Sequence, residues 1–170
     1  IVPTAPLSTS NTELHIKGTD ASIIDKSQNV NLALYGNTTG STTTNFTGAK
    51  SIYFDGTSNT YVEVPEIYAS RWTGVWTLEF WIRTSSSIVN DFILGRANSN
   101  GVLHILTMNS GDRLRVAFWG GPNIDSGSLS VNTWYHVGID FDGTTCTAFL
   151  DGSSFGSSTP TVNMTAGDEF

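Results

Sequence analysis

Residues 132–152 read NTWYHVGIDFDGTTCTAFLDG, and this stretch decides the fold class. Trp134–Phe141 and Thr145–Leu150 are short runs in which apolar residues recur in alternation, as in β-strands that bury one face. Asp142-Gly143 joins the two runs, and this dipeptide favours a type I′ hairpin turn. Asp151-Gly152 repeats the turn signal at the next corner. The stretch therefore predicts a β-hairpin that ends in a second turn.

Short alternating runs of the same kind continue outward along the chain. Trp76–Arg83 (WTLEFWIR) shows the clearest alternation, with Trp76, Leu78, Phe80 and Ile82 on one side. Further strands are expected at Glu13–Lys17, Val30–Tyr35, Ser51–Phe54, Tyr61–Val64, Phe92–Leu94, Val102–Met108 and Leu114–Trp119. No stretch carries a sustained apolar stripe at helical spacing. We therefore predict an all-β fold, a two-sheet antiparallel β-sandwich of the jelly-roll type.

The length and the turn-rich composition favour one domain. The 170 residues are enough to bury a two-layer core but few for two independent cores. Residues 1–12 (IVPTAPLSTSNT) carry two prolines and small polar residues, and we expect an N-terminal arm or linker there. The low-complexity stretch TTGSTTTN at 38–45 is too short to divide the chain. Residues 13–170 are therefore predicted to form the domain.

Charge and cysteine content exclude several classes of partner. The chain has a net charge of −7 and only 14% charged residues, whereas nucleic-acid binding needs clustered lysines and arginines. No apolar run approaches the ~20 residues that span a bilayer. We therefore expect no nucleic-acid partner and no membrane insertion. Cys146 stands alone, so no internal disulfide is possible, and its alternation with Ala148 and Leu150 points it toward the core.

Several segments resemble, in order, the laminin-G-like branch of the concanavalin A-like lectin/glucanase superfamily, in its phage and bacterial form. They are ELHIKGTDASIIDKSQN (13–29), SIYFDGTSNTYVEVP (51–65), WTLEFWIRT (76–84) and the stretch at 132–152. Each motif is short, and their order along residues 13–155 is what carries the resemblance. The resemblance implies a jelly roll of two curved antiparallel sheets, in agreement with the alternation.

The C-terminal end departs from the family pattern. In the family, the Asp-Gly turn is followed by an "x-I-G" strand and a final "G-x-I-D-E-x-R-I" strand, whereas this chain reaches MTAGDEF (164–170) without either motif. We therefore expect the domain to lack the family's last strands. A sheet edge left in this way invites pairing with another chain. The sequence is accordingly interpreted as a fragment of a longer protein, or as one completed by a partner chain.

The residues give no support for catalysis. Glycan hydrolases of the superfamily carry paired acids on one strand, and alternate residues of a strand share a face. Glu79 is followed two positions later by Trp81, and Asp142, which shares a face with Asp140, serves a turn. His15 and His104 have no partners at zinc-ligand spacing. We therefore expect that the chain is not an enzyme, and that His136, in the family's W-x-H-V position, is structural.

Two kinds of binding site are considered, neither with a sequence signature of its own. Related modules bind Ca²⁺ through loop carboxylates, so Asp20 and Asp25 are candidate Ca²⁺ ligands, with backbone capping in turns as the alternative. No other cofactor is expected. Glycan recognition needs aromatic faces with polar groups around them, and the candidate residues are Trp72, Trp119, Tyr135 and Asn123, with core or rim packing as the alternative. Trp81 is expected to be packed.

These observations predict a non-catalytic recognition or adhesion module, glycan-binding and displayed on a surface. The settings considered are a phage virion, as a capsid decoration or tail fibre, and a bacterial surface protein, so the location is extracellular or on the virion surface. A cell-surface glycan and structural chains that complete the sheet edge are the expected partners. One alternative is a purely structural domain for protein–protein interaction or capsid stabilisation. The other is an inactive or divergent domain related to glycan hydrolases.

Overall fold

The structure is a computed structural model in which two compact units, Ile1–Ile67 and Tyr68–Phe170, form along the chain. It describes residues 15–18, 23–25, 27, 31–42, 50–57, 59–64, 74–87, 91–95, 103–107, 111–118 and 121–162. All regular elements among these residues are β-strands. The predicted N-terminal arm at 1–12 lies outside the described residues, and the predicted single domain over 13–170 stays a prediction.

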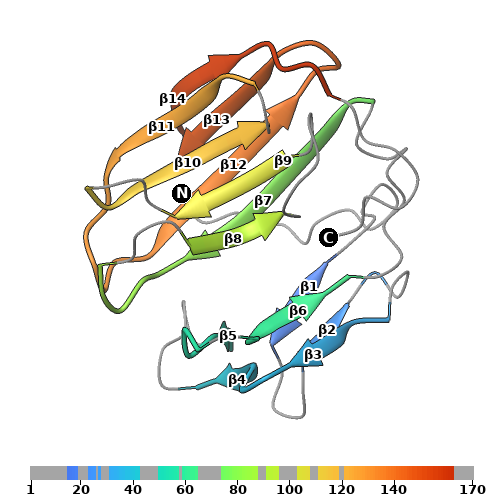
Figure 1. Cartoon of the computed structure of the whole chain (residues 1–170), viewed down its shortest axis with the longest axis vertical. Coiled ribbons are helices and arrows are strands. Elements are labelled where there is room, and N and C mark those ends of the chain that lie inside the picture. The colour runs from blue at the N-terminus through green and yellow to red at the C-terminus, as the bar shows by residue number, and fades with distance from the viewer. Residues whose placement is uncertain are drawn as a thin grey trace. The chain divides into compact units, whose positions relative to one another are not determined.

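The described residues of the N-terminal unit form three antiparallel strand pairs (Figure 1). They are β1 (Ile16–Gly18) with β2 (Ile23–Asp25), β3 (Ala33–Tyr35) with β6 (Tyr61–Glu63), and β4 (Thr39–Ser41) with β5 (Ser51–Tyr53). Gly36 follows β3 with a φ of 62°, and a Cβ there would lie 2.6 Å from the Asn59 carbonyl oxygen. The turn after β3 therefore requires glycine, both for its backbone angle and for the space it leaves.

The C-terminal unit contains two four-stranded antiparallel sheets. One has the order β11-β10-β9-β8, with strands at Asn123–Ser128, Arg113–Phe118, Leu103–Thr107 and Asp91–Gly95. The other has the order β14-β13-β12-β7, with strands at Ser153–Ser158, Cys146–Leu150, Tyr135–Phe141 and Trp76–Ile82. The chain thus leaves the second sheet after β7, builds the first sheet, and returns for β12 to β14 (Figure 1). The predicted all-β sandwich is confirmed.

The core of this unit lies between the two sheets and follows the predicted alternation. Its buried members are contributed by β10, β11, β12, β13 and the loop after β11: Leu114, Val116, Phe118, Ile124, Leu129, Val137, Ile139, Phe141, Cys146 and Ala148. Trp76, Leu78, Phe80 and Ile82 of β7 pack against them. Cys146 and Ala148 have no exposed surface, so Cys146 is the buried small side chain that the alternation predicts. None of the described segments is a helix long and apolar enough to span a membrane.

Four strands were not expected from the sequence: β2, β4, β11 and β14. The last three read TGS, NIDSGS and SSFGSS, and so lack the apolar alternation that predicts a strand. β14 begins directly after Asp151-Gly152, where the departure from the family pattern had suggested no strand. The absence of the family's final strand stays a prediction, since nothing in the described residues tests it.

Of the two corners with an Asp-Gly turn signal, the second forms a type I′ turn and the first does not. Asp151 and Gly152 have φ angles of 48° and 80° between the paired residues Leu150 and Ser153, as a two-residue type I′ turn requires. At the first corner only Gly143 has a positive φ. The carboxylate of Asp142 accepts hydrogen bonds there from the backbone N–H groups of Thr144 and Thr145, at 2.8 and 2.7 Å. The prediction for Asp142-Gly143 was wrong because the aspartate holds a longer loop through its side chain.

Candidate functional site

The outer face of the β14-β13-β12-β7 sheet gathers aromatic and polar side chains. Because Val137 and Ile139 of β12 point into the core, the alternate residues of these strands face outward. We call the following residues the outer face: Thr77, Glu79 and Trp81 of β7, His136, Gly138 and Asp140 of β12, and Thr147 and Phe149 of β13. The strand register arranges them in three rows, headed on β7 by Trp81, Glu79 and Thr77.

The first row places the indole of Trp81 beside the imidazole of His136. The two ring centroids lie 5.0 Å apart with an interplanar angle of 43°, and both side chains are half-buried. Asp151 fixes the backbone of His136 through two hydrogen bonds. The His136 N–H donates to Asp151 Oδ1 at 2.8 Å, and the Asp151 N–H donates to the His136 carbonyl at 2.9 Å. Trp81 was expected to be packed, and its half-buried ring lies against His136 on the outward side of β7.

The second row places Phe149 over a glycine. Gly138 pairs with Phe149 on one side and with Glu79 on the other. A Cβ at Gly138 would lie 3.6 Å from Cβ and 3.9 Å from Cδ2 of Phe149, so the ring leans over the glycine and buries it. An aromatic residue that covers a cross-strand glycine protects the backbone there. The half-buried ring of Phe149 therefore lies against the sheet surface.

Two exposed carboxylates complete the outer face. Asp140 Oδ1 accepts a hydrogen bond of 2.7 Å from Thr77 Oγ1 in the third row, and Glu79 lies diagonally from Asp140 across β7 and β12. Diagonal neighbours of this kind have Cβ atoms roughly 7–8 Å apart. Alternation along a single strand predicts only carboxylates two residues apart on that strand. It therefore does not reveal Glu79 and Asp140, which lie on two neighbouring strands.

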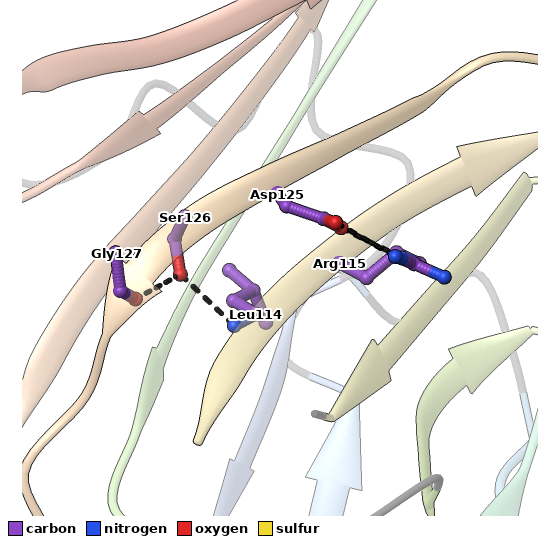
Figure 2. A network of polar contacts seen from close by, with 5 residues as sticks. All are labelled: Leu114, Arg115, Asp125, Ser126 and Gly127. Carbon is purple, nitrogen blue, oxygen red and sulfur yellow. Dashed lines mark hydrogen bonds and ion pairs between the residues drawn. The ribbon is translucent and has the colours of Figure 1, made fainter. Parts of the chain in front are cut away.

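The outer face of the other sheet carries an ion pair, shown in Figure 2. Arg115 of β10 pairs in register with Asp125 of β11, and two hydrogen bonds join them, Nε to Oδ1 at 2.6 Å and Nη2 to Oδ2 at 2.7 Å. These hydrogen bonds hold the pKa of Asp125 below its ordinary range. Asn123 lies exposed two residues before Asp125, opposite Ala117. The guanidinium and the carboxylate satisfy each other, whereas Asn123 is exposed on the same pair of strands.

The predicted site residues are not brought together among the described residues. Asn123 lies on the β10–β11 surface, whereas Tyr135 is half-buried at the start of β12, packs against the core and accepts a hydrogen bond of 2.9 Å at its hydroxyl from the Ser130 N–H. Trp72, Trp119 and Asp20 lie outside the described residues, and of Asp25 only the backbone, in β2, is described. Binding by these residues, including Ca²⁺ binding by Asp20 and Asp25, stays a prediction.

Asp55, in the turn between β5 and β6, accepts four hydrogen bonds through its carboxylate. Its Oδ1 accepts hydrogen bonds from the Thr57 N–H, the Thr57 hydroxyl and the Thr60 hydroxyl, and its Oδ2 accepts one from Asn37 at 2.6 Å. These bonds, led by the one from the Thr57 hydroxyl, hold the pKa of Asp55 well below its ordinary value. Asp55 therefore holds its own turn. Within the described ranges no group of three or more His, Cys, Asp or Glu residues is placed to hold a metal ion.

A second aromatic pair lies in the N-terminal unit, which also contains Asp55. Tyr35 and Tyr61 pair across β3 and β6, with their ring centroids 4.4 Å apart and nearly parallel at 13°. A hydrogen bond to Glu63 raises the pKa of the Tyr35 hydroxyl. Each ring covers one face of the other, so this pair supports the β3–β6 pairing.

Comparison with known proteins gives one family match and several similar folds. A family model described as the concanavalin A-like lectin/glucanases superfamily matches residues 55–170. No curated protein sequence matches the chain significantly. One similar structure is domain 4 of AbnA, an extracellular GH43 arabinanase from Geobacillus stearothermophilus, solved in complex with arabinotriose. It has a TM-score of 0.63 and 12% identity, and the match covers 93% of this chain and 82% of that one.

Another similar structure is a botulinum neurotoxin type C chain, whose cell entry is described as dependent on interaction with two ganglioside molecules. The TM-score is 0.65 at 13% identity, and the match covers 89% of this chain and 40% of the toxin chain. At these identities the likeness concerns the fold.

Proposed function

This chain belongs to the concanavalin A-like lectin/glucanases superfamily, and from that premise we propose that it is a non-catalytic module whose sandwich binds carbohydrate. One observation carries the proposal: the outer face sets the rings of Trp81 and Phe149 among the carboxylates of Glu79 and Asp140 and the hydroxyl of Thr77. The arabinotriose complex of the arabinanase domain and the ganglioside interaction of the toxin support carbohydrate as the class of ligand.

The chemistry of the outer face suits a sugar. A sugar ring presents C–H groups that pack on an aromatic face, and hydroxyls that donate to carboxylates and accept from side-chain donors. Aromatic side chains supply much contact area, and hydrogen bonds to charged groups are about twice as strong as neutral ones. Glu79 and Asp140 are exposed beside the two rings, so they can accept from sugar hydroxyls without leaving a buried charge uncompensated.

The same carboxylates argue for binding and against hydrolysis. An inverting glycosidase separates its two carboxyl groups by ~6.5–9.5 Å, a range that the diagonal placement of Glu79 and Asp140 approaches. A glycosidase also shelters its general acid in an apolar, water-excluded pocket. Both side chains are instead exposed on the sheet surface, and Asp140 already accepts a hydrogen bond from Thr77. The two exposed carboxylates are therefore suited to accepting hydrogen bonds from sugar hydroxyls.

The setting is part of the proposal. We propose display on the outside of a virion or a bacterial cell, with adhesion as the role. The composition supports this, because polarity comes from Ser, Thr, Asn and Gly more than from charged residues. Partner chains that complete a sheet edge belong to the same proposal.

The test is a glycan array followed by calorimetry on the hits, with and without Ca²⁺. We expect binding that Trp81→Leu weakens about tenfold or more, since the variant removes an aromatic face. Ser128→Ala, exposed on β11 in the other sheet, is the matched control and should bind as the parent does. Carbohydrate binding is overturned if the folded protein binds no glycan in either condition. Release of reducing sugar from a bound glycan would overturn the non-catalytic assignment, and loss of binding without Ca²⁺ would add the ion as a cofactor.

A further inference from the structure

We infer that the outer face takes an oligosaccharide of roughly three or more sugar units that carries no acidic groups, laid diagonally across β7, β12 and β13 from Trp81 to Phe149. This inference rests on the proposed function and specifies its ligand. It depends on two features of the outer face, the separation of the two rings and the sign of the charges between them.

The separation of the rings sets the length of the ligand. Trp81 and Phe149 lie on the strands that flank β12, in rows two residues apart, because Trp81 pairs with His136 and Phe149 pairs with Gly138. With neighbouring strands ~4.8 Å apart and a rise of ~3.4 Å per residue, their Cα positions are about 12 Å apart. One sugar ring cannot cover both aromatic side chains at this distance. A ligand that packs on both must have at least one further unit between the two that stack.

The surface between the rings supplies hydrogen-bond acceptors in the right place. The diagonal from Trp81 to Phe149 crosses β12 at His136 and Gly138, and Glu79 pairs with Gly138 from the β7 side. Gly138 has no side chain, and the Phe149 side chain lies 3.6 Å from where its Cβ would stand. The exposed Glu79 carboxylate then stands beside the path of the chain, where it can accept from sugar hydroxyls.

The charges of the outer face exclude acidic sugars. Glu79 and Asp140 are carboxylates, and none of the outer-face residues defined above is a lysine or an arginine. A uronate or sialate would therefore meet like charge at Glu79 and Asp140. Arg83 follows β7 two residues after Trp81, and its Nη2 donates to Asn132 Oδ1 at 2.9 Å. Arg113 and Arg115 lie on β10 in the other sheet, and Arg115 is engaged by Asp125. The net charge of −7 acts in the same direction.

The experiment uses the whole 170-residue chain and an array of neutral and acidic glycans of graded length. We expect the hits to be free of acidic groups, and affinity to rise about tenfold or more from the monosaccharide to the trisaccharide of the same sugar. Trp81→Leu and Phe149→Leu should each remove most of that gain. Leucine keeps apolar contact with the neighbouring strand, and thermal unfolding of each variant checks that the fold is retained.

Charge is tested with Glu79→Gln and Asp140→Asn, which keep hydrogen-bonding groups but remove the negative charge. Acidic glycans should gain affinity in these variants, while binding of the neutral trisaccharide falls. Ser128→Ala, exposed on β11 in the other sheet, is the control and should change neither. A preference of the parent for uronates or sialates, or equal affinity for mono- and trisaccharide, overturns this inference and leaves carbohydrate binding in place. Silence across the array overturns the proposed function itself.

Discussion

Gly156 of β14 and Ile124 of β11 meet where the edges of the two C-terminal sheets come together. A Cβ on Gly156 would lie 2.6 Å from Cγ2 of Ile124, which is closer than real Cβ contacts allow. Ile124 is 4% exposed and belongs to the core, so its side chain has little room to withdraw. Figure 1 shows β11 and β14 side by side, each at the end of its sheet's strand order. The glycine therefore sets how closely the two edges approach.

Gly156→Ala should lower the free energy of unfolding by about 1–3 kcal/mol, because the added methyl group overpacks a filled core. Urea unfolding measures the change. Ile124→Ala deletes the obstructing Cγ2, so the double variant should lose less stability than the sum of the two single variants. Gly127→Ala is the control, since a Cβ there meets nothing within 4 Å. A Gly156→Ala protein as stable as the parent would contradict the contact.

The Arg115–Asp125 pair predicts a pH dependence of stability. The hydrogen bonds from Arg115 lower the pKa of Asp125 from the ordinary aspartate value of 3.8, against a smaller opposing effect of burial. A lowered pKa in the folded state means that the stabilisation is fully present above the unfolded value and is lost as the pH falls through the folded one. Asp125→Asn should thus cost about 1 kcal/mol near pH 7, and this difference from the parent should shrink as the pH falls below 3.8 and through the lower pKa of the folded state. Chemical unfolding at several pH values measures it; a difference that persists unchanged in acid would be inconsistent with the pair.

Ser126 supports an irregularity in β11. Arg113 pairs with Ser128 and Arg115 with Asp125, so Leu114 alone opposes Ser126 and Gly127, which is a β-bulge. Ser126 Oγ accepts from the Leu114 N–H at 2.9 Å and donates to the Gly127 carbonyl at 2.7 Å (Figure 2). Ser126→Ala leaves the Leu114 N–H buried without this acceptor, and should cost about 1–3 kcal/mol in urea unfolding. Ser128→Ala, exposed two residues further on, should be neutral; equal effects of the two would show that the bulge does not depend on this hydroxyl.

The sequence predicts strands well where burial imposes alternation. β7, β10, β12 and β13 each supply apolar residues to one core, so their pattern has period two and their positions are confirmed to within about two residues. β11 and β14 escape this reasoning because serine, glycine and aspartate occupy most of their positions. They are strands because of what they pair with: β11 extends β10, and β14 extends β13. Pairing with the preceding strand leaves no apolar alternation in the added strand, so the local pattern does not reveal it.

The candidate site was harder to predict than the fold. Sequence reasoning judged each aromatic residue by its own neighbours and favoured Trp72, Trp119, Tyr135 and Asn123. The outer face instead depends on cross-strand register, which brings Trp81 to His136 and Phe149 to Gly138. One available signal was the alternation itself. If Leu78 and Phe80 face the core, then Glu79 and Trp81 face outward on the same strand.

Cys146 provides a probe of how firmly the sandwich is closed. The thiol has no exposed surface at the start of β13, and burial, aided by the charge of Asp140, raises its pKa to about 11. The thiolate is the reactive form, and the thiol is both buried and protonated. A reagent such as Ellman's can therefore react with Cys146 only after the core opens. In the native protein at pH 8 we expect labelling slower by about three orders of magnitude or more than in urea-unfolded chain, where the thiol returns to its ordinary pKa. The ratio of the two rates reports the free energy of the opening that exposes Cys146.

Gly156→Ala should raise the native rate, since it weakens the contact between the sheet edges, whereas Gly127→Ala should leave it unchanged. Complete labelling of the native parent within the mixing time would show that the two sheets do not enclose this core.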